Sequence, residues 1–407
     1  MEQVLYNLPD GWEWQQLADV VVKTENLNPL KNADQLWTYI DISSVDCDRF
    51  MVTDPKEILG KDAPSRAKKH VQLNDVIFAT TRPNLKNIAL VRDEYRSPVA
   101  STGFCVFRAN EKVLSAYLFY FLITDFVQAQ IEPYVGGASY PAITDGNLKR
   151  APIPIPGIEE QKRIVEKLDA LLARIGSVIE HLQQSVTLAD ALYTSSLDQV
   201  FDKVYLDYSM KPLYALASKI GSGATPKGGQ KAYKKSGISL IRSLNVYDSE
   251  FKVEGLAFID DDQAGKLSNV VVEEGDVLLN ITGASIARCC IAPVEFLPAR
   301  VNQHVCIIRP NKELNSAYLN YLLISPKFKA ALLFQGAGGA TRQALTKVMV
   351  SNLDIPLPPL EKQIELVGKV NLLSKKNRAL KELVNSKISD LITLKASILN
   401  VAFKGGL

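Results

Sequence analysis

Basic, amide and hydroxyl side chains gather in several short polar segments of this 407-residue chain. In the first half, the candidate binding residues are Arg66, Lys68, Lys69, His70, Thr80, Thr81, Arg82, Asn84 and Lys86. In the second half, they are Thr225, Lys227, Gln230, Lys231, Thr282, Arg288, Arg342 and Gln343. Lysine, arginine and hydroxyl groups contact phosphates, and arginine, asparagine and glutamine read base edges. The segments therefore predict contacts with nucleic acid; the alternative for each residue alone is a solvated surface charge.

These candidates adjoin predicted strands or lie in loops. The polar run 80–86 directly follows the apolar run 76–79, and Thr282 follows the apolar run 277–279. Short apolar runs bounded by polar residues are typical of buried strands. We expect 66–70 to form a basic loop and the glycine-rich segment around 225–235 to form another.

Motifs of the enzymes that act on nucleic acids are missing. The only Pro-Pro pair, 358–359, lacks the Asn or Asp and the aromatic residue that an N6-adenine methyltransferase needs to hold its base. The glycine pair 223 and 228 has P-loop spacing, but Gly229 and Gln230 stand where Lys and Ser or Thr are required. Asp248, Glu250 and Lys252 loosely resemble a nuclease pattern that is common by chance. We therefore expect a chain with no catalytic site.

The amino-acid composition narrows the classes of protein to which the chain could belong. The chain is 47% hydrophobic and 22% charged, as ordinary globular proteins are, and its net charge of +3 permits nucleic-acid binding without demanding it. Five cysteines and three histidines, with no C-x-x-C pair, make a zinc site or a disulfide framework improbable and favour small buried thiols. Neither a membrane-spanning run nor a signal pattern is evident, so a cytoplasmic protein that binds no cofactor and no membrane is expected.

The sequence contains an internal repeat, in which similar segments recur at an offset of about 200 residues. Segment 74–78 aligns with 275–279, 104–108 with 305–309, 136–138 with 338–340, and 153–156 with 355–358. Each half predicts a mixed α/β domain whose loops differ from those of the other. In each half an apolar segment, 117–127 or 318–333, predicts one helix, and proline at every second residue of 153–156 and 355–358 predicts an extended connector.

A long helix is predicted after each connector. Apolar residues at steps of three and four, typical of a coiled-coil seam, are Ile164, Leu168, Leu171, Ile175, Val178 and Leu182, and then Val370, Leu373, Leu380, Val384, Leu391, Leu394, Ile398 and Val401. Asn377 falls on the second seam, where a polar residue can fix the register. Glutamates 159, 160 and 361 mark the helix starts, and each helix would run for about 40 residues, or roughly 60 Å.

The predicted fold is therefore α/β (α+β), with two globular domains separated by two long antiparallel coiled-coil helices and a pseudo-two-fold internal repeat. The predicted boundaries are 1–157 for the first domain, 158–205 for the first helix, 206–359 for the second domain and 360–407 for the second helix. Similar domains at a fixed spacing, with different loops, suit the reading of two different half-sites on one duplex.

The repeated plan resembles the specificity subunits of type I restriction-modification enzymes over essentially the whole chain. The resemblance rests on the opening Leu-Pro-Asp-Gly-Trp at 8–12, the Gly-Gly-Ala segments, the proline connectors leading into Glu-Glu-Gln and Glu-Lys-Gln, and the endings 195–201 and 397–405. The halves depart from one another at Tyr140 and Pro141, where the second half has Arg342 and Gln343. Each motif alone is weak, but their order and repetition are specific.

The resemblance implies two target-recognition domains that bind double-stranded DNA at a bipartite, asymmetric site. It also implies two methyltransferase subunits that use S-adenosylmethionine and, where the system has them, two restriction subunits that use ATP and Mg²⁺. The helices would set the spacing and dock these subunits. The competing hypothesis is a coiled-coil adaptor with two protein-binding heads; it predicts no salt-dependent affinity for DNA.

Overall fold

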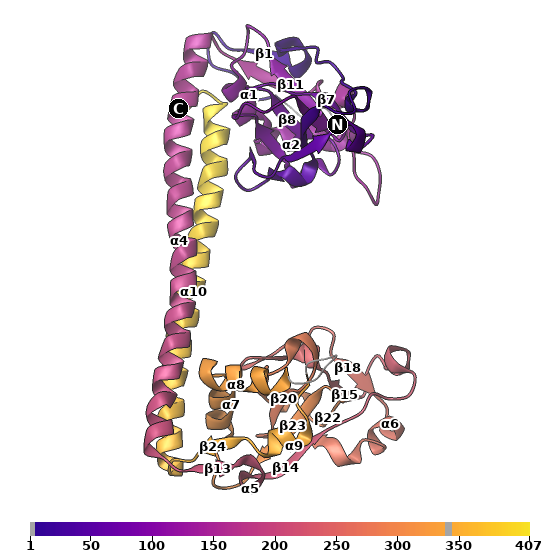
Figure 1. Cartoon of the computed structure of the whole chain (residues 1–407). Coiled ribbons are helices and arrows are strands. Elements are labelled where there is room, and N and C mark those ends of the chain that lie inside the picture. Colours follow the sequence, from indigo (N-terminus) through magenta and orange to yellow (C-terminus); the bar gives the residue numbers. More distant parts are fainter. Residues whose placement is uncertain (1–4, 338–343) are drawn as a thin grey trace. The chain divides into compact units, whose positions relative to one another are not determined.

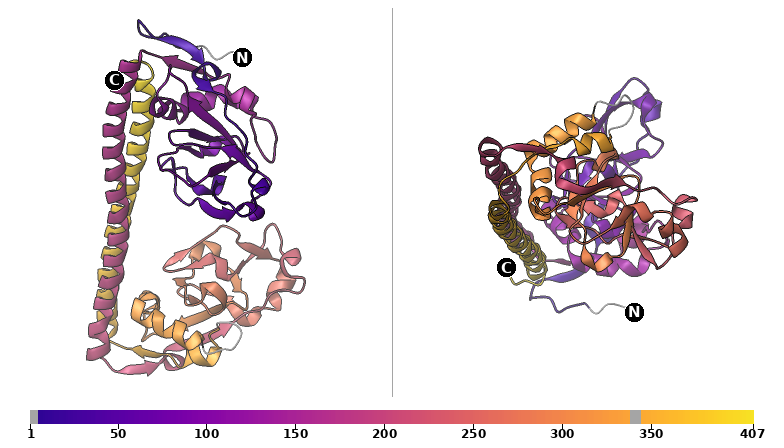
Figure 2. Two further views of the ribbon diagram at one scale, coloured as in Figure 1. Left: turned by 45° about the horizontal axis from the view of Figure 1, so that its top comes forward. Right: turned by 90° about the horizontal axis from the view of Figure 1, so that it is seen from below.

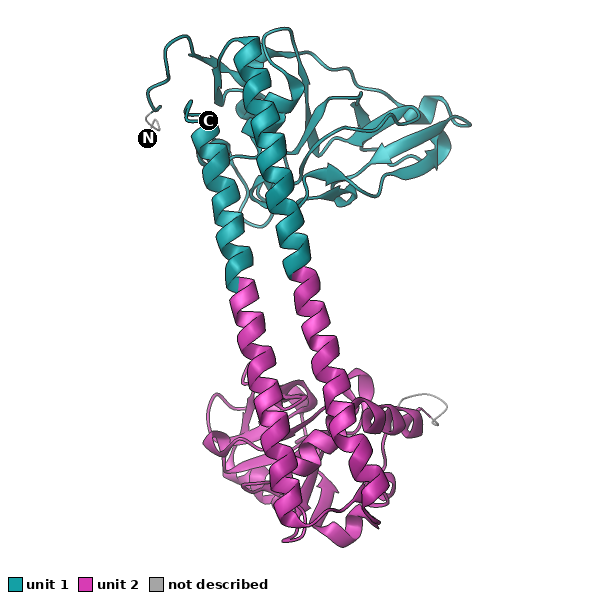
Figure 3. Ribbon diagram, turned by 90° about the vertical axis from the view of Figure 1, so that its left-hand side faces the viewer, with its two compact units in different colours: residues 1–182, 386–407 teal, residues 183–385 magenta. Residues whose placement is uncertain are grey.

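The computed structural model describes residues 5–337 and 344–407 and divides into two compact units (Figure 3). Unit 1 comprises residues 1–182 and 386–407, and unit 2 comprises residues 183–385. Each unit holds one α/β domain and a stretch of both long helices, α4 (Ile158–Asp207) and α10 (Leu360–Ala402) (Figure 1).

The strands of unit 1 form two four-stranded sheets and two strand pairs. They are β1 (Glu13–Gln16), β2 (Val21–Val22), β3 (Leu36–Ile40), β4 (Val45–Asp46), β5 (Met51–Val52), β6 (Lys56–Leu59), β7 (Ala67–His70), β8 (Val76–Ala79), β9 (Ile88–Leu90), β10 (Pro98–Ser101), β11 (Phe104–Ala109) and β12 (Pro152–Ile155). The sheet orders are β6-β3-β10-β7 and β2-β11-β8-β9, with the pairs β1-β12 and β4-β5. The β3–β10 pairing is parallel and the others are antiparallel.

Unit 2 repeats this topology strand for strand. Its strands are β13 (Met210–Pro212), β14 (Ala217–Ser222), β15 (Ile238–Ile241), β16 (Val246–Tyr247), β17 (Glu250–Phe251), β18 (Ala257–Ile259), β19 (Val271–Val272), β20 (Val277–Asn280), β21 (Cys289–Ile291), β22 (Ala299–Val301), β23 (Val305–Pro310) and β24 (Asp354–Pro356). The orders are β18-β15-β22-β19 and β14-β23-β20-β21, with the pairs β13-β24 and β16-β17. The single parallel pairing recurs between β15 and β22. The predicted internal repeat is confirmed.

Short helices also recur, and one expectation about them is wrong. Unit 1 has α1 (Ser115–Leu122), α2 (Asp125–Ile131) and α3 (Asp145–Leu148), and unit 2 has α5 (Leu213–Leu216), α6 (Asp261–Gly265), α7 (Ser316–Ile324), α8 (Pro326–Gly336) and α9 (Lys347–Ser351). The predicted single helix 117–127 is two helices. Thr124 is extended and its hydroxyl accepts a hydrogen bond from the Val127 N–H, which starts a new helix. In unit 2, Pro326 has no N–H to continue α7 and begins α8 instead.

The two proline-rich connectors form edge strands. β12 pairs with β1 and β24 pairs with β13, each in a two-stranded sheet. The extended conformation predicted from the prolines is thus confirmed. A proline can occupy such an edge because its missing N–H is not needed by a second neighbour.

The long helices run antiparallel within each unit. In unit 1, Ile164 and Leu168 of α4 share a core with Leu399 and Ala402 of α10. Figures 1 and 2 show the C-terminus beside the first turns of α4, where the Arg163 guanidinium donates to the Leu407 carbonyl oxygen over 2.5 Å. In unit 2, the end of α4 packs against the beginning of α10, where Phe201 joins one core with Leu366 and Val370. The predicted pairing is confirmed.

The seam itself is less regular than its sequence suggests. Four predicted seam residues, Val178, Leu380, Leu394 and Val401, are 40–47% exposed. An α-helix drifts by about 20° per heptad relative to a strict seven-residue repeat, so a three-four pattern leaves the interface over a long helix. α4 has 50 residues and α10 has 43, so the expected length of about 40 is too short for α4.

A polar contact joins the two helices in unit 2. Asn377 of α10 donates to the Asp190 carboxylate of α4 over 3.0 Å, and Lys381 pairs with the same carboxylate at 2.9 Å. These bonds lower the pKa of Asp190 from its ordinary value, with the Asn377 bond as the largest cause. The predicted seam residue Asn377 therefore contacts α4 through an acid that the hydrophobic pattern did not mark.

Each long helix is anchored to its domain by one buried glutamine. Gln161 accepts from the Leu114 N–H over 2.9 Å and donates to the Lys112 and Pro156 carbonyls over 2.8 and 2.9 Å. Gln363 repeats all three bonds, accepting from the Asn315 N–H over 2.8 Å and donating to the Glu313 and Pro358 carbonyls. Both glutamines are completely buried.

A buried tyrosine completes each anchor. Tyr117 donates to the Pro154 carbonyl over 2.8 Å, and Tyr318 donates to the Pro356 carbonyl over 2.7 Å. The end of the domain and the start of the helix are thus held by the same hydrogen bonds from side chains to main-chain groups in both units.

Candidate nucleic-acid interface

Four polar segments of unit 1 are joined by main-chain hydrogen bonds. The Thr80 N–H donates to the Gly103 carbonyl over 2.8 Å, and the Thr80 carbonyl accepts from the Ile143 N–H over 2.9 Å. The neighbouring Thr102 N–H donates to the Arg66 carbonyl over 2.8 Å. The structure therefore brings together the segment that follows β8, the β10–β11 turn, the start of β7 and the segment before α3.

Unit 2 builds the same frame from different residues. The Ile281 N–H donates to the His304 carbonyl over 3.0 Å, and the Ile281 carbonyl accepts from the Leu345 N–H over 2.8 Å. The Gly223 N–H donates to the Asn302 carbonyl over 3.1 Å. The loop that follows β20 thus lies beside the β22–β23 turn and the segment before α9, as its counterpart does in unit 1. The third bond differs: in unit 2 it joins the turn to the glycine-rich loop 223–231 after β14, whereas in unit 1 it joins the turn to the start of β7.

An arginine and a tyrosine protrude from the frame of unit 1. The guanidinium carbon of Arg82 lies 5.3 Å from the centre of the Tyr140 ring, and Tyr140 is 71% exposed. Arg82 has a left-handed backbone, φ 50°, and its N–H donates to the Pro141 carbonyl over 2.6 Å. Within the described residues, no carboxylate pairs with Arg82. Its charge is therefore available to a partner, while its side chain is held against the ring.

Three other predicted contacts in unit 1 already have acidic partners. Arg66 pairs with Asp41 at 2.7 Å, Lys69 with Asp145 at 2.8 Å and Lys86 with Asp125 at 2.6 Å. These acids are 25, 76 and 39 residues away in the sequence. An ion pair within the protein reduces the charge that each cation offers to DNA.

The remaining candidates of unit 1 differ in exposure. Lys68 and Asn84 are exposed, Thr81 is half-buried, and the expected basic loop 66–70 is largely strand β7. Thr80 is 7% exposed and donates to the Gly103 carbonyl over 3.0 Å, so it supports the frame instead of pointing outward. The buried Nδ1 atom of His70 has no hydrogen-bond partner among residues 5–337 and 344–407.

In unit 2, the glycine-rich loop carries three exposed candidates, Lys227, Gln230 and Lys231. Thr225 is half-buried and its hydroxyl donates to the Gln303 side-chain oxygen. Arg342 and Gln343 lie outside the described residues.

A hollow of about 390 Å³ opens beside the frame of unit 2. Its lining includes the predicted residues Thr282 and Arg288, together with Tyr247 and His304, which the sequence did not single out. The Arg288 guanidinium lies 4.4 Å from the Tyr247 ring centre, and the Lys252 ammonium lies 4.2 Å from the same centre. Two cations therefore rest on one aromatic ring at the hollow.

The described residues hold no cluster of metal ligands, and four of the five cysteines are buried while Cys47 is half-buried. Residues 5–337 and 344–407 contain no group of three or more His, Cys, Asp or Glu side chains that could hold a metal ion. Burial raises the pKa of Cys290 and of Cys306 to about 12, which keeps both thiols protonated at neutral pH. Asp248 pairs with Lys329, and Lys252 lies on Tyr247, so the nuclease-like pattern is not assembled as a cluster.

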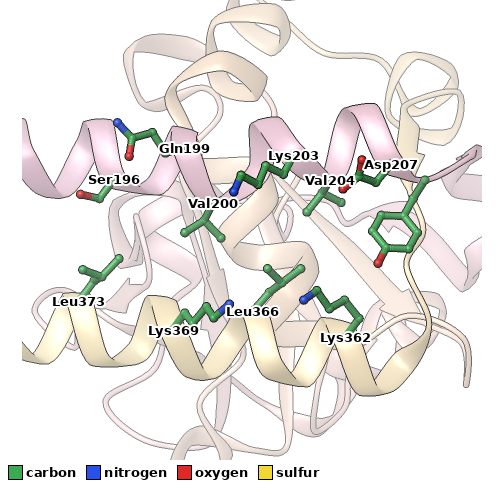
Figure 4. A pocket seen from close by; sticks show the side chains of 11 residues that line it. Ser196, Gln199, Val200, Lys203, Val204, Asp207, Lys362, Leu366, Lys369 and Leu373 are labelled. Carbon is green, nitrogen blue, oxygen red and sulfur yellow. The ribbon is translucent and has the colours of Figure 1, made fainter.

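Helices α4 and α10 offer a different kind of surface. In unit 2, a groove of about 500 Å³ lies between them, with Val200, Val204 and Leu366 toward its floor (Figure 4). Leu188 and Leu192, one helical turn apart on α4, are each 69% exposed. The two leucines therefore form a short exposed apolar row on α4. Within the described residues, no helix is long and apolar enough to span a membrane.

Duplicated α/β domains that present different polar side chains on one backbone frame, each anchored to a long helix, define a class of two-domain recognition proteins. The family model for the type I restriction modification DNA specificity domain matches residues 9–188 and 216–389. The chain belongs to the family of type I restriction-modification specificity subunits.

Solved and curated relatives agree with this assignment. The chain is 32% identical to the HsdS subunit from Thermoanaerobacter tengcongensis, with 99% of both chains covered and a TM-score of 0.58. It is also 32% identical to a chain from a study of complex assembly and conformational transition in the type I restriction-modification system, with 99% and 100% covered and a TM-score of 0.83. The MjaVIII specificity subunit of Methanocaldococcus jannaschii is 24% identical over 97% of this chain and 95% of its own.

Proposed function

We propose that this chain is the non-catalytic DNA-reading subunit of a type I restriction-modification enzyme. Each α/β domain reads one half of a bipartite, asymmetric site on double-stranded DNA. The observation that carries this proposal is the repeated frame with different side chains. Arg82 and Tyr140 protrude in unit 1, whereas Thr282, Arg288 and His304 line a hollow in unit 2. Domains with the same frame and different contact residues would read different sequences.

The proposal extends to the partners that carry out the chemistry. Two methyltransferase subunits, which bind S-adenosylmethionine, dock on the exposed surfaces of α4 and α10. Restriction subunits that use ATP and Mg²⁺ join this assembly in systems that have them. The exposed Leu188 and Leu192 and the groove of Figure 4 support this placement, because apolar helix surfaces are stabilised when a partner covers them. The relative solved in a study of type I complex assembly is consistent with such partners.

Methylome mapping tests the DNA-reading role. The chain is co-expressed with the methyltransferase from its own locus in a host that lacks adenine methylation, and methylated adenines are located by sequencing. We expect one bipartite motif with a fixed gap, which disappears when this chain is omitted. Exchanging residues 1–157 for the first domain of a relative should change one half-site only. Methylation that is unaffected by the chain would contradict the proposal and favour the adaptor hypothesis.

Co-purification tests the docking surface. The double variant Leu188→Asp, Leu192→Asp places two carboxylates on the apolar row of α4, so the methyltransferase should no longer co-purify. Gln183→Asp, at an exposed position on another face of the same helix, is the control and should leave the complex intact. Normal co-purification of the double variant would place the docking surface elsewhere.

A further inference from the structure

The hollow of unit 2 combines positive charge with an ordered hydroxyl group. Arg288 is half-buried and its guanidinium carbon lies over the Tyr247 ring, which the Lys252 ammonium also contacts. In the part of the chain that the structure describes, no carboxylate pairs with Arg288 or with Lys252. Both charges are therefore positioned by an aromatic ring and are not neutralised by an ion pair.

A chain of hydrogen bonds orients the Thr282 hydroxyl. The Thr225 hydroxyl donates to the side-chain oxygen of Gln303, so the Gln303 amide nitrogen faces the His304 ring, 3.1 Å from Nε2. Because an amide nitrogen can only donate, Nε2 accepts and the ring proton resides on Nδ1. Nδ1 lies 2.5 Å from the Thr282 oxygen and donates to it. The proton of the Thr282 hydroxyl is then free to donate into the hollow.

We propose that this hollow binds one backbone phosphate of the half-site that unit 2 reads, with Arg288 as the charge-pairing residue and Thr282 as a hydrogen-bond donor. The inference rests on the proposed DNA-reading function and deepens it. It assigns Tyr247, Gln303 and His304 as positioning residues, because they act on the phosphate through Arg288 and Thr282.

Shape favours a phosphate over a base edge. Base edges lie at the floor of the major groove, about 8.5 Å deep, and are reached by side chains that protrude from the protein. Arg288 lines a concavity here, and its guanidinium carbon lies over the Tyr247 ring, 4.4 Å from the ring centre. Phosphates protrude from the duplex surface, so they fit a concave site with hydroxyl and guanidinium donors. In unit 1, by contrast, the protruding Arg82 and Tyr140 have the form expected for base contacts.

The test is the salt dependence of DNA binding by Arg288→Gln. Full-length wild-type and variant chains, each with the co-expressed methyltransferase, are titrated with a duplex that carries the mapped site, over a range of salt concentrations. Loss of one phosphate contact should weaken binding about tenfold at low salt and reduce the magnitude of the log–log salt slope by about 0.9. The methylated motif should stay unchanged. Lys266→Gln, which removes an exposed charge from the same unit, is the control and should bind as the wild type does.

A second variant separates the hydroxyl from the charge. Thr282→Val keeps the shape of the side chain and should weaken binding about fivefold with an unchanged salt slope, as expected for one neutral hydrogen bond. Equal urea midpoints for all variants would show that folding is intact.

Two outcomes overturn the inference while leaving the proposed function in place. One is an Arg288→Gln variant that binds as the wild type does. The other is an unchanged salt slope with relaxed specificity at one base pair, which would make Arg288 a base reader. If the wild type itself lacks salt-dependent, site-specific binding, the proposed function fails as well, so the two failures are distinguishable.

Discussion

Replacing Gln161 with leucine should lower the free energy of unfolding of unit 1 by about 3 kcal/mol. The substitution removes three hydrogen bonds and leaves the Leu114 N–H and the carbonyls of Lys112 and Pro156 without a partner. An unsatisfied buried group costs about 1–3 kcal/mol, and the Pro156 bond is fully buried. The other two groups are partly buried and cost less, and the larger apolar surface of leucine offsets part of the sum.

Tryptophan fluorescence is the assay of choice, since all three tryptophans, residues 12, 14 and 37, belong to unit 1. With a urea m-value of about 3 kcal/mol/M, a loss of this size lowers the unfolding midpoint by about 1 M. Gln184→Leu introduces the same change at an exposed position of α4 and should shift the midpoint little. A Gln161→Leu midpoint as close to the wild type as that of this control would refute the argument, because the buried bonds would then contribute nothing to stability.

Three further predictions concern an ion pair, a titration and a DNA contact. Asp276→Asn should destabilise unit 2 by about 3 kcal/mol, because Asp276 is fully buried and accepts two hydrogen bonds from Arg309. Urea unfolding followed by circular dichroism measures the change in stability, and a loss below about 1 kcal/mol would contradict this prediction. Hydrogen bonds from Asn377 and Lys381 lower the pKa of Asp190 in the folded chain. The ionised Asp190 therefore stabilises the fold fully above its ordinary pKa of 3.8, and this stabilisation is lost as the pH falls from 3.8 through the lowered pKa of the folded chain. The difference in urea midpoint between the wild type and Asp190→Asn should therefore narrow below that pH, and a constant difference would be the contrary result. Arg82→Ala should reduce the preference for the correct base about 10- to 100-fold at one base pair of a single half-site, as measured by methylome mapping. An altered base preference in both half-sites would contradict the assignment of unit 1 to one half-site.

The architecture could be predicted from the sequence because it is encoded in repeated local patterns. The offset between the halves predicted the duplication, the alternating prolines predicted the extended connectors, and the three-four spacing predicted the paired helices. The break between α1 and α2 was missed because apolar residues continue on either side of the polar pair Thr124 and Asp125, which supplies the cap and the first-turn acid of the new helix.

The candidate interface was only partly predictable, because charge pairing depends on tertiary contacts. Arg66, Lys69 and Lys86 looked like free cations, yet their acidic partners lie far away along the chain and meet them only in the folded domain. Tyr140, which was noted only as a difference between the halves, and His304 were not predicted as binding residues for a related reason. Their sequence surroundings are unremarkable, and their relation to Arg82 and Thr282 arises from the meeting of distant loops.

The two glutamine anchors place few demands on the side chains of the domain that each of them holds. Every bond of Gln161 and Gln363 goes to a main-chain atom, so the side chains at the bonded positions are free to vary. They have already done so between the two halves, where Lys112 corresponds to Glu313 and Leu114 to Asn315. A domain exchanged for that of a relative can therefore keep these hydrogen bonds to the helix, so that one half of the recognised sequence changes while the other half is retained.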